Sequence, residues 1–193
     1  MNTDDPHEIE LVFADLPAGD FWVFAYGSLM WRPDFDFVEK RDAWLPGYRR
    51  SLCVWSWHHR GTEENPGLVF GLDKSVAKAD IRCQGCVYRV AAENRVATLI
   101  NLRDRELITN IYQPAVLDLQ TAQQETLPAL TFIVDQQHPQ YAGQLPAERC
   151  AEIVRSSRGK SGENTDYVLS TWNYLAACNI QDEHLRAVCE HLA

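Results

Sequence analysis

Short runs of aromatic and β-branched residues, separated by turn-forming residues, dominate the first two thirds of the chain. Such runs are typical of β-strands. They predict strands at residues 21–26, 68–72, 86–90, 111–119 and 130–134. Residues 41–57 have the same character but are broken by Pro46 and Gly47, which favour a turn, so this stretch forms two strands or one bent strand. Pro114 predicts an edge position or a bulge in its strand.

Apolar residues recur at helical spacing in three later stretches, and this period predicts amphipathic helices. The predicted helices cover residues 92–103, a stretch capped by Asn164 or Ser161, and a last stretch that begins at Asp182. Strands thus fill most of the first two thirds and helices most of the last third. This order predicts an α+β fold, with a curved or barrel-like sheet flanked by helices.

The first 20 residues differ from the rest, because they are polar and contain proline. We expect residues 1–20 to form a flexible N-terminal arm. The remaining residues, 21–193, contain no internal repeat, low-complexity tract or linker, and a chain of this length can bury a substantial core. They are therefore predicted to form a single domain.

Composition limits the classes of partner. The formal net charge of −9 argues against nucleic acids and anionic membrane surfaces. No apolar run approaches the length of a membrane span, and the acidic start lacks the features of a secretory signal. The six cysteines are therefore expected to be reduced thiols in the cytoplasm. The sequence gives no indication of oligomeric state.

The end of the first predicted strand carries the most suggestive chemistry. Tyr26 is followed by Gly27, which has wide backbone freedom, and by Ser28, which adds a hydroxyl. Consecutive backbone N–H groups in such a turn can curl around a small anion. An ordinary tight turn at a strand end is the alternative. Residues 31–35 are predicted to begin a short helical turn.

Metal and redox sites have little support in the sequence. Cys83 and Cys86 have CxxC spacing, but no second pair follows at similar spacing to complete a zinc site, so both are expected to be structural. His58 and His59 would point to opposite faces of an extended chain. We therefore predict no metal. Arg60 in the same loop is either available to a carboxylate or part of a solvated loop.

Catalytic candidates are equally few when each residue is taken alone. No Gly-x-Ser-x-Gly elbow or glycine-rich phosphate signature is present, which predicts no cofactor. Ser28 has no base near it in sequence. Glu106 lies beside Asp104 and Arg105, and such a group is most often a solvated charge cluster. Tyr167 is expected in a helix core, where it could form a pocket wall.

Several motifs, taken together and in order, resemble the ChaC family of γ-glutamylcyclotransferases, enzymes that act on glutathione. The resemblance spans residues 21–180. It rests on residues 23–32, 46–50, 55–62, 66–69 and 86–90, on Arg105-Glu106 with Tyr112 six residues later, and on residues 161–164 with Tyr167. This combination is far more specific than any one motif.

The resemblance implies a γ-glutamylcyclotransferase-like fold with a small barrel-like mixed sheet. It implies that glutathione is cleaved to 5-oxoproline and Cys-Gly, with Glu106 as catalytic acid/base and Tyr112 lining the pocket. It also implies that the γ-glutamyl group is bound by Val23, Phe24, Ala25, Tyr26, Gly27, Ser28 and Leu29. Because a carboxylate at its usual pKa is a weak base for an amine, we expect Glu106 to be partly buried with a raised pKa.

The chain departs from the family pattern in two places: the family usually has Gly at the position of Ala25 and Gly-Gly at the positions of Asn110 and Ile111. Asn tolerates a left-handed backbone, whereas β-branched Ile does not, so the path between Glu106 and Tyr112 stays open. Two alternatives also remain. The chain could act on other γ-glutamyl amino acids or amines, or it could be a non-catalytic regulatory binding module with the same fold.

Overall fold

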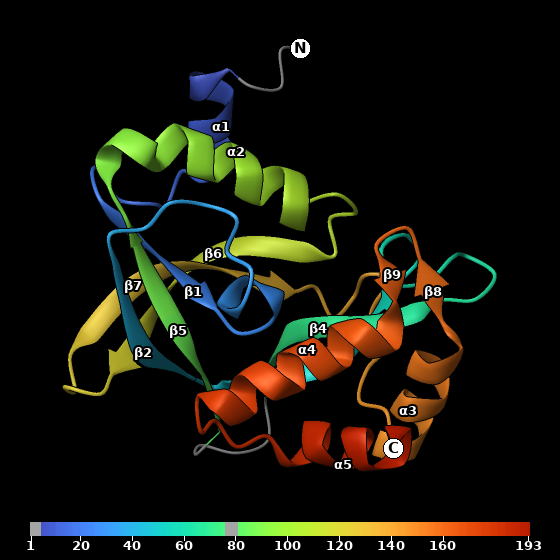
Figure 1. Cartoon of the computed structure of the whole chain (residues 1–193). Helices are drawn as coiled ribbons and strands as arrows, with labels where there is room; N and C mark the ends of the chain where they lie inside the picture. The colour runs from blue at the N-terminus through green and yellow to red at the C-terminus, as the bar shows by residue number, and fades with distance from the viewer. Residues whose placement is uncertain (1–4, 76–80) are drawn as a thin grey trace. The chain divides into compact units, whose positions relative to one another are not determined.

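The structure is a computed structural model that describes residues 5–75 and 81–193 (Figure 1). It divides into two compact units, each made from two stretches of chain. The first unit comprises Met1–Arg49 and Lys74–Ile133, and the second comprises Arg50–Asp73 and Val134–Ala193. Neither unit is a continuous segment. The single domain expected over residues 21–193 therefore stays a prediction, and the units are described separately.

The first unit is built on a closed barrel of five strands, as the sequence predicted. The strands follow the order β1-β5-β2-β6-β7, and β7 pairs in parallel with β1, with Val23 opposite Leu130. β1 also runs antiparallel to β5, so the sheet is mixed. The strands are β1 (Phe21–Ala25), β2 (Glu39–Pro46), β5 (Arg82–Val90), β6 (Tyr112–Thr121) and β7 (Thr126–Val134).

The centre of this barrel is closely packed where β1 meets β5. Val23, Phe24 and Ala25 have no exposed area, and Ala25 lies opposite Cys86. A Cβ atom on Gly85 would lie 2.2 Å from the carbonyl oxygen of Ala25. Only glycine fits there, since real side chains do not approach so closely. The glycine inside the CxxC motif therefore has a packing role in the barrel.

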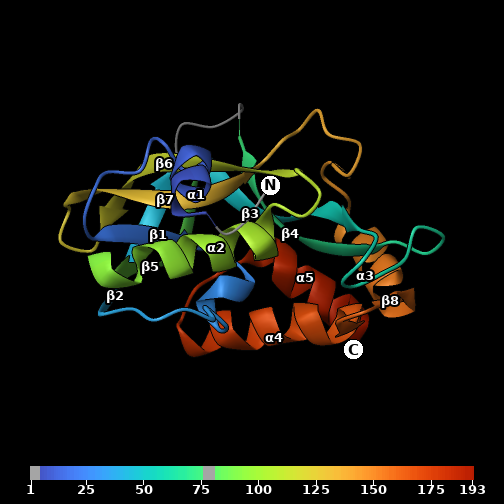
Figure 2. The same ribbon diagram turned by 90° about the horizontal axis from the view of Figure 1, so that it is seen from above.

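Helices α1 (Pro6–Val12) and α2 (Arg95–Glu106) lie side by side in the first unit (Figures 1 and 2). Asp5 caps α1 by accepting a hydrogen bond from the backbone N–H of His7. Ile9 is buried, and Glu10 forms two hydrogen bonds of 2.7 and 2.9 Å with Arg95 of α2. Within the flexible arm expected over residues 1–20, Pro6–Val12 instead form a helix, because apolar burial and a charge pair hold it. Residues 1–4 lie outside the described residues.

The second unit combines two neighbouring strands, β3 (Tyr48–Ser56) and β4 (Gly67–Lys74), with three helices. The helices contact one another and are α3 (Ala147–Ser156), α4 (Asn164–Ala177) and α5 (Glu183–Leu192). A small hairpin, β8 (Arg158–Gly159) and β9 (Gly162–Glu163), precedes α4. The sequence interpretation did not predict α3.

Local details decide several alternatives. Gly47 has a φ of +79°, so residues 41–57 form two strands joined at a turn rather than one bent strand. Asn164 begins α4 but does not cap it: its side-chain amide bonds the N–H and C=O of Leu68 at 2.7 and 2.8 Å. Asp182 caps α5 as predicted, through the N–H of Leu185.

Candidate active site

The turn after β1 is a short 3-10 helix, η1 (Ser28–Met30), rather than the helical turn predicted at residues 31–35. The carbonyls of Gly27 and Ser28 accept hydrogen bonds from the N–H groups of Met30, Trp31 and Arg32, at 2.9, 3.3 and 2.9 Å. The first N–H groups of a helical turn have no carbonyl partner inside that turn. This geometry fits the hypothesis that N–H groups at the end of β1 receive an anion.

The side chains around this turn are part of the core. Tyr26 is 7% exposed and donates a hydrogen bond of 3.0 Å to the carbonyl of Phe132, and Leu29 is 6% exposed. Gly27 has a φ of −129°, so the turn does not use a left-handed residue. Because the side chains of β1 are buried, the turn's main chain is the part suited to ligand binding. The binding role of residues 23–29 stays a prediction.

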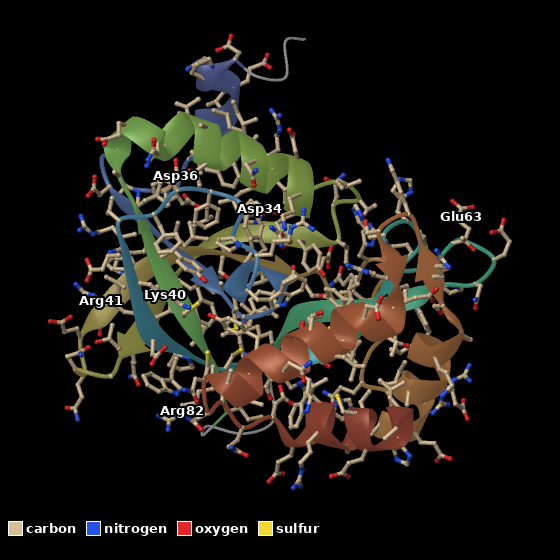
Figure 3. All side chains as sticks on the ribbon, viewed as in Figure 1. Asp34, Asp36, Lys40, Arg41, Glu63 and Arg82 are labelled. Atoms are coloured by element: carbon tan, nitrogen blue, oxygen red, sulfur yellow. The ribbon has the colours of Figure 1, made fainter. Side chains whose placement is uncertain are left out.

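Arg105 connects this turn to the end of α2. Its guanidinium donates hydrogen bonds to the hydroxyl of Ser28 at 2.9 Å and to the carbonyl of Arg32 at 2.7 Å. It also pairs with the carboxylate of Asp34 at 3.1 Å. Asp34, labelled in Figure 3, lies in the loop that follows η1. The Arg105 side chain is only 22% exposed. A single planar cation therefore ties the loop from Ser28 to Asp34 to the helix.

Glu106 is the last residue of α2 and the next residue after this cation. Its carboxylate lies 3.3 Å from Nε of Arg105, and its side chain is 14% exposed. Burial raises the pKa of Glu106, and the nearby charge of Arg105 opposes part of that rise. The expected burial and raised pKa are thus confirmed. The alternative expectation, a solvated charge, fits the neighbouring residue Asp104 instead, because its side chain is 61% exposed.

The connection from Glu106 to Tyr112 is short and well defined. Asn110 takes a left-handed conformation with a φ of +58°, which Asn tolerates at low cost. Ile111 is 2% exposed, and it is not among the non-glycine residues with a positive φ in the described part of the chain, so the β-branched residue avoids the strained conformation. Tyr112 then begins β6 and is partly buried. This path answers the question raised by the departure from Gly-Gly, while a pocket role for Tyr112 stays a prediction.

Arg60 and Tyr167 belong to the second unit and contact each other. The guanidinium carbon of Arg60 lies 5.3 Å from the centre of the Tyr167 ring, and its Nη1 donates to the carbonyl of Glu163 at 3.1 Å. The Tyr167 hydroxyl accepts a hydrogen bond from the N–H of Phe70 at 3.1 Å. These contacts exclude a freely solvated loop for Arg60. A role for either residue in binding stays a prediction.

The cysteines and histidines occupy separate places. All six cysteines lie in the described residues, and none of them forms a disulfide there. Cys83 and Cys86 are three positions apart in β5, so their side chains point to opposite faces. Nδ1 of His59 lies 2.9 Å from the hydroxyl of Ser161. Within residues 5–75 and 81–193, no group of three or more His, Cys, Asp or Glu could hold a metal ion. In the same residues, no helix is long and apolar enough to span a membrane.

Arg105 is the site residue whose role sequence reasoning missed. Its partners Ser28, Arg32 and Asp34 precede it by 77, 73 and 71 residues, so no local spacing could connect them. The available signal was weaker. Arg105 forms part of the Arg-Glu pair in the motif, and an arginine next to a carboxylate is suited to fixing its orientation.

The chain is similar to several known proteins. A family model described as ChaC-like protein matches residues 21–193. The glutathione-specific gamma-glutamylcyclotransferase of Escherichia coli (strain K12) is 34% identical, over 86% of this chain and 70% of the relative. The glutathione-specific gamma-glutamylcyclotransferase 1 of Homo sapiens is 31% identical, over 98% and 88%.

A solved structure supports the fold independently. The crystal structure of a yeast gamma-glutamyl cyclotransferase specific to glutathione superposes with a TM-score of 0.80, covering 90% of this chain and 97% of the yeast chain. At 20% identity this likeness concerns the fold alone. It confirms the α+β fold class expected from the sequence.

Proposed function

Because the chain belongs to the ChaC-like protein family, we propose that it is a γ-glutamylcyclotransferase that cleaves glutathione to 5-oxoproline and Cys-Gly. The names of the bacterial and human relatives support glutathione as the substrate. The observation that carries the proposal is the carboxylate of Glu106, withdrawn from water at the end of α2 and linked by Arg105 to the turn after β1.

The reaction requires neither a metal nor a covalent nucleophile. The α-amine of the γ-glutamyl residue attacks its own γ-carbonyl carbon, forming the C–N bond of a five-membered lactam. The amide bond to the cysteine nitrogen then breaks. Because both reacting groups belong to one molecule, holding them in a near-attack geometry can supply effective molarities on the order of 10⁵ to 10⁸ M. Binding in the correct conformation is therefore a large part of the catalysis.

Glu106 moves the proton in this scheme. Its carboxylate takes one proton from the substrate ammonium, and the attacking nitrogen loses a second as the C–N bond forms. Both protons pass by way of this carboxylate to the departing cysteine nitrogen, so the products are the neutral lactam and the Cys-Gly ammonium. At a reference pKa of about 4.3, a Glu is roughly 3.5 units below an α-amine near 8, a gap of about 5 kcal/mol. Burial raises the pKa of Glu106 and narrows this gap. The nearby charge of Arg105 opposes part of this rise and favours the ionised carboxylate that acts as the base.

The turn after β1 supplies the local positive potential that an acidic chain lacks. Its formal net charge of −9 repels an anionic substrate at long range. The N–H groups at Gly27 and Ser28 receive the α-carboxylate of the γ-glutamyl group, since backbone N–H groups at the start of a helical turn favour an anion. Ser28 does not act as a nucleophile, because its hydroxyl already accepts a hydrogen bond from Arg105.

The direct test is to incubate the purified protein with glutathione, oxidised glutathione or γ-glutamyl-alanine and to follow 5-oxoproline by mass spectrometry. We expect product from glutathione that appears together with Cys-Gly. Product from γ-glutamyl-alanine alone would replace the substrate with another γ-glutamyl amino acid. If none of the three gives product, the proposed enzymatic function is wrong and the non-catalytic binding module is favoured. Glu106→Gln serves as the matched control for contaminating activity.

A further inference from the structure

Arg105 contacts both the Ser28 hydroxyl, in the turn after β1, and the carboxylate of Glu106. We propose that Arg105 is a positioning residue that holds the turn at Ser28 and the carboxylate of Glu106 in one fixed geometry. This inference rests on the proposed function, because it concerns how that site is held together. In the proposed function, the turn binds the α-carboxylate of the γ-glutamyl group and Glu106 deprotonates the α-amine of that same group. The distance between the turn and Glu106 must therefore match one small substrate.

The contacts of Arg105 divide among its three nitrogens. Nη2 bonds the Ser28 hydroxyl at 2.9 Å, and Nη1 bonds the Arg32 carbonyl at 2.7 Å and the Asp34 carboxylate at 3.1 Å. Nε lies 3.3 Å from Glu106. A guanidinium can serve all four acceptors because its five N–H donors are fixed in one plane. A lysine ammonium lacks this fork, so it could keep the charge without keeping the geometry.

The loop that Arg105 holds is shaped to meet it. Asp34 has a left-handed backbone conformation with a φ of +58°, which only a few residue types adopt readily. Its carboxylate also pairs with Arg32 at 2.9 Å. Inside the turn, the N–H of Arg32 donates to the carbonyl of Ser28 at 2.9 Å. Two independent links, one internal and one through Arg105, therefore fix the position of Ser28.

The charged groups around Glu106 in the first unit also point to Arg105. Arg105 is the charge that acts on the pKa of Glu106, and it lowers a pKa that burial raises. Arg32 and Asp34 contact Arg105, and the carboxylate of Asp104 pairs with the guanidinium of Arg103 at 2.6 Å. Arg105 therefore acts on both the position of the carboxylate and its charge state.

The test compares Arg105→Ala and Arg105→Lys with Arg41→Ala as the matched control. The control also removes one ion-paired guanidinium from the first unit, but its partners Glu39 and Glu125 are not residues of the candidate site. We expect Arg105→Ala to lower kcat/KM for glutathione about 10²-fold, with kcat falling and KM rising, because both ends of the site move. Arg105→Lys should be only partly active, and Arg41→Ala should stay within about twofold of wild type.

Three further measurements separate positioning from a general structural role. The acid limb of the kcat/KM profile should move to higher pH in Arg105→Ala, because the carboxylate loses a neighbouring cation. Millimolar guanidinium should restore part of the activity, with sodium chloride at equal ionic strength as its control. Ser28→Ala should lower kcat/KM in the wild type but change it little in the Arg105→Ala background, since the shared contact is already lost.

The outcomes are distinct from those of the proposed function. If the wild type forms no 5-oxoproline from any substrate, the function itself fails. If the wild type is active and folded Arg105→Ala, checked by circular dichroism, matches it in kcat/KM and pH profile, the positioning role is overturned. It is also overturned if the Ser28→Ala and Arg105→Ala effects simply multiply. Should Arg105→Ala not fold, Arg105→Lys and Ser28→Ala, alone and combined in one chain, decide the question.

Discussion

Two shielded carboxylates, one in each unit, have very different surroundings. In the second unit, Asp73 has no exposed area, and its Oδ1 accepts hydrogen bonds from the side chains of Gln136 at 2.7 Å and Tyr141 at 3.0 Å. In the first unit, Glu106 keeps 14% of its side chain exposed and lies 3.3 Å from a cation that is shared with three other acceptors. These two hydrogen bonds to Asp73 come from neutral side chains, whereas Glu106 lies beside a guanidinium.

The comparison separates two uses of the same chemical group. A carboxylate that accepts several hydrogen bonds, as Asp73 does, cross-links its surroundings. A carboxylate that loses solvent without full compensation has a raised pKa, as Glu106 has, and is better matched to exchanging a proton with an amine. Burial by itself therefore does not identify a catalytic group. The number and kind of its partners do.

The largest expected effect comes from changing Glu106. Glu106→Gln keeps the size of the side chain but removes the base, and general acid–base catalysis contributes about 10² to 10⁴-fold to rates. We expect a loss of kcat in this range, measured by 5-oxoproline formation. Asp73→Asn is the matched control, since it makes the same change at the hydrogen-bonded carboxylate and should leave kcat near that of wild type. Comparable activity in Glu106→Gln and wild type would remove Glu106 from the mechanism.

The next largest effect is on stability rather than activity, and it comes from changing Asp73. Asp73→Ala leaves the donors of Gln136 and Tyr141 without their acceptor, which should cost about 1–3 kcal/mol of unfolding free energy. Urea unfolding followed by fluorescence would measure the loss. If Asp73→Ala is as stable as wild type, Asp73 is not the structural cross-link described above. Its kcat at a temperature where it is folded should be unchanged.

A smaller effect concerns pH and stability at Glu106. A carboxyl group whose pKa is raised in the folded state stabilises the fold fully below its unfolded pKa, near 4.3, and this contribution is lost as pH rises through the folded pKa. Gln cannot ionise. Glu106→Gln should therefore melt at a higher temperature than wild type at neutral pH, and the difference should shrink as the pH falls towards about 4. Equal melting temperatures at all pH values would contradict the burial of a charged group here.

The smallest effect concerns Glu10, whose pKa is shifted in the opposite direction to that of Glu106. The hydrogen bonds of Glu10 to Arg95 hold its pKa below the usual value, so its contribution to stability is present above its unfolded pKa and is lost as pH falls through the lower, folded pKa. Because its side chain is 39% exposed, Glu10→Gln should cost less than about 1 kcal/mol at neutral pH. Thermal melts between acidic and neutral pH would detect it. A Glu10 variant more stable than wild type at neutral pH would contradict the expected direction.

Much of the fold could be predicted because local patterns carried it. Strand positions, the α+β order and the barrel-like sheet follow from runs of β-branched and aromatic residues, and Asp182 caps its helix as its side chain suggests. Predictions failed where a distant contact outweighed local preference. The polar start of the chain folds as α1 because Ile9 is buried and Glu10 meets Arg95, 85 residues later. Asn164 bonds Leu68 instead of capping α4.

The sequence by itself determined the motif order that marks the ChaC-like family and, through it, the candidates for the site: the turn at Gly27 and Ser28 and the carboxylate of Glu106. The tertiary structure decided the state of those residues. Whether Glu106 is solvated or buried, and whether Ser28 is a free hydroxyl or a partner of Arg105, depends on segments about 77 residues apart meeting in space. Desolvation and long-range hydrogen bonds are properties of packing, and no local spacing in a chain encodes them.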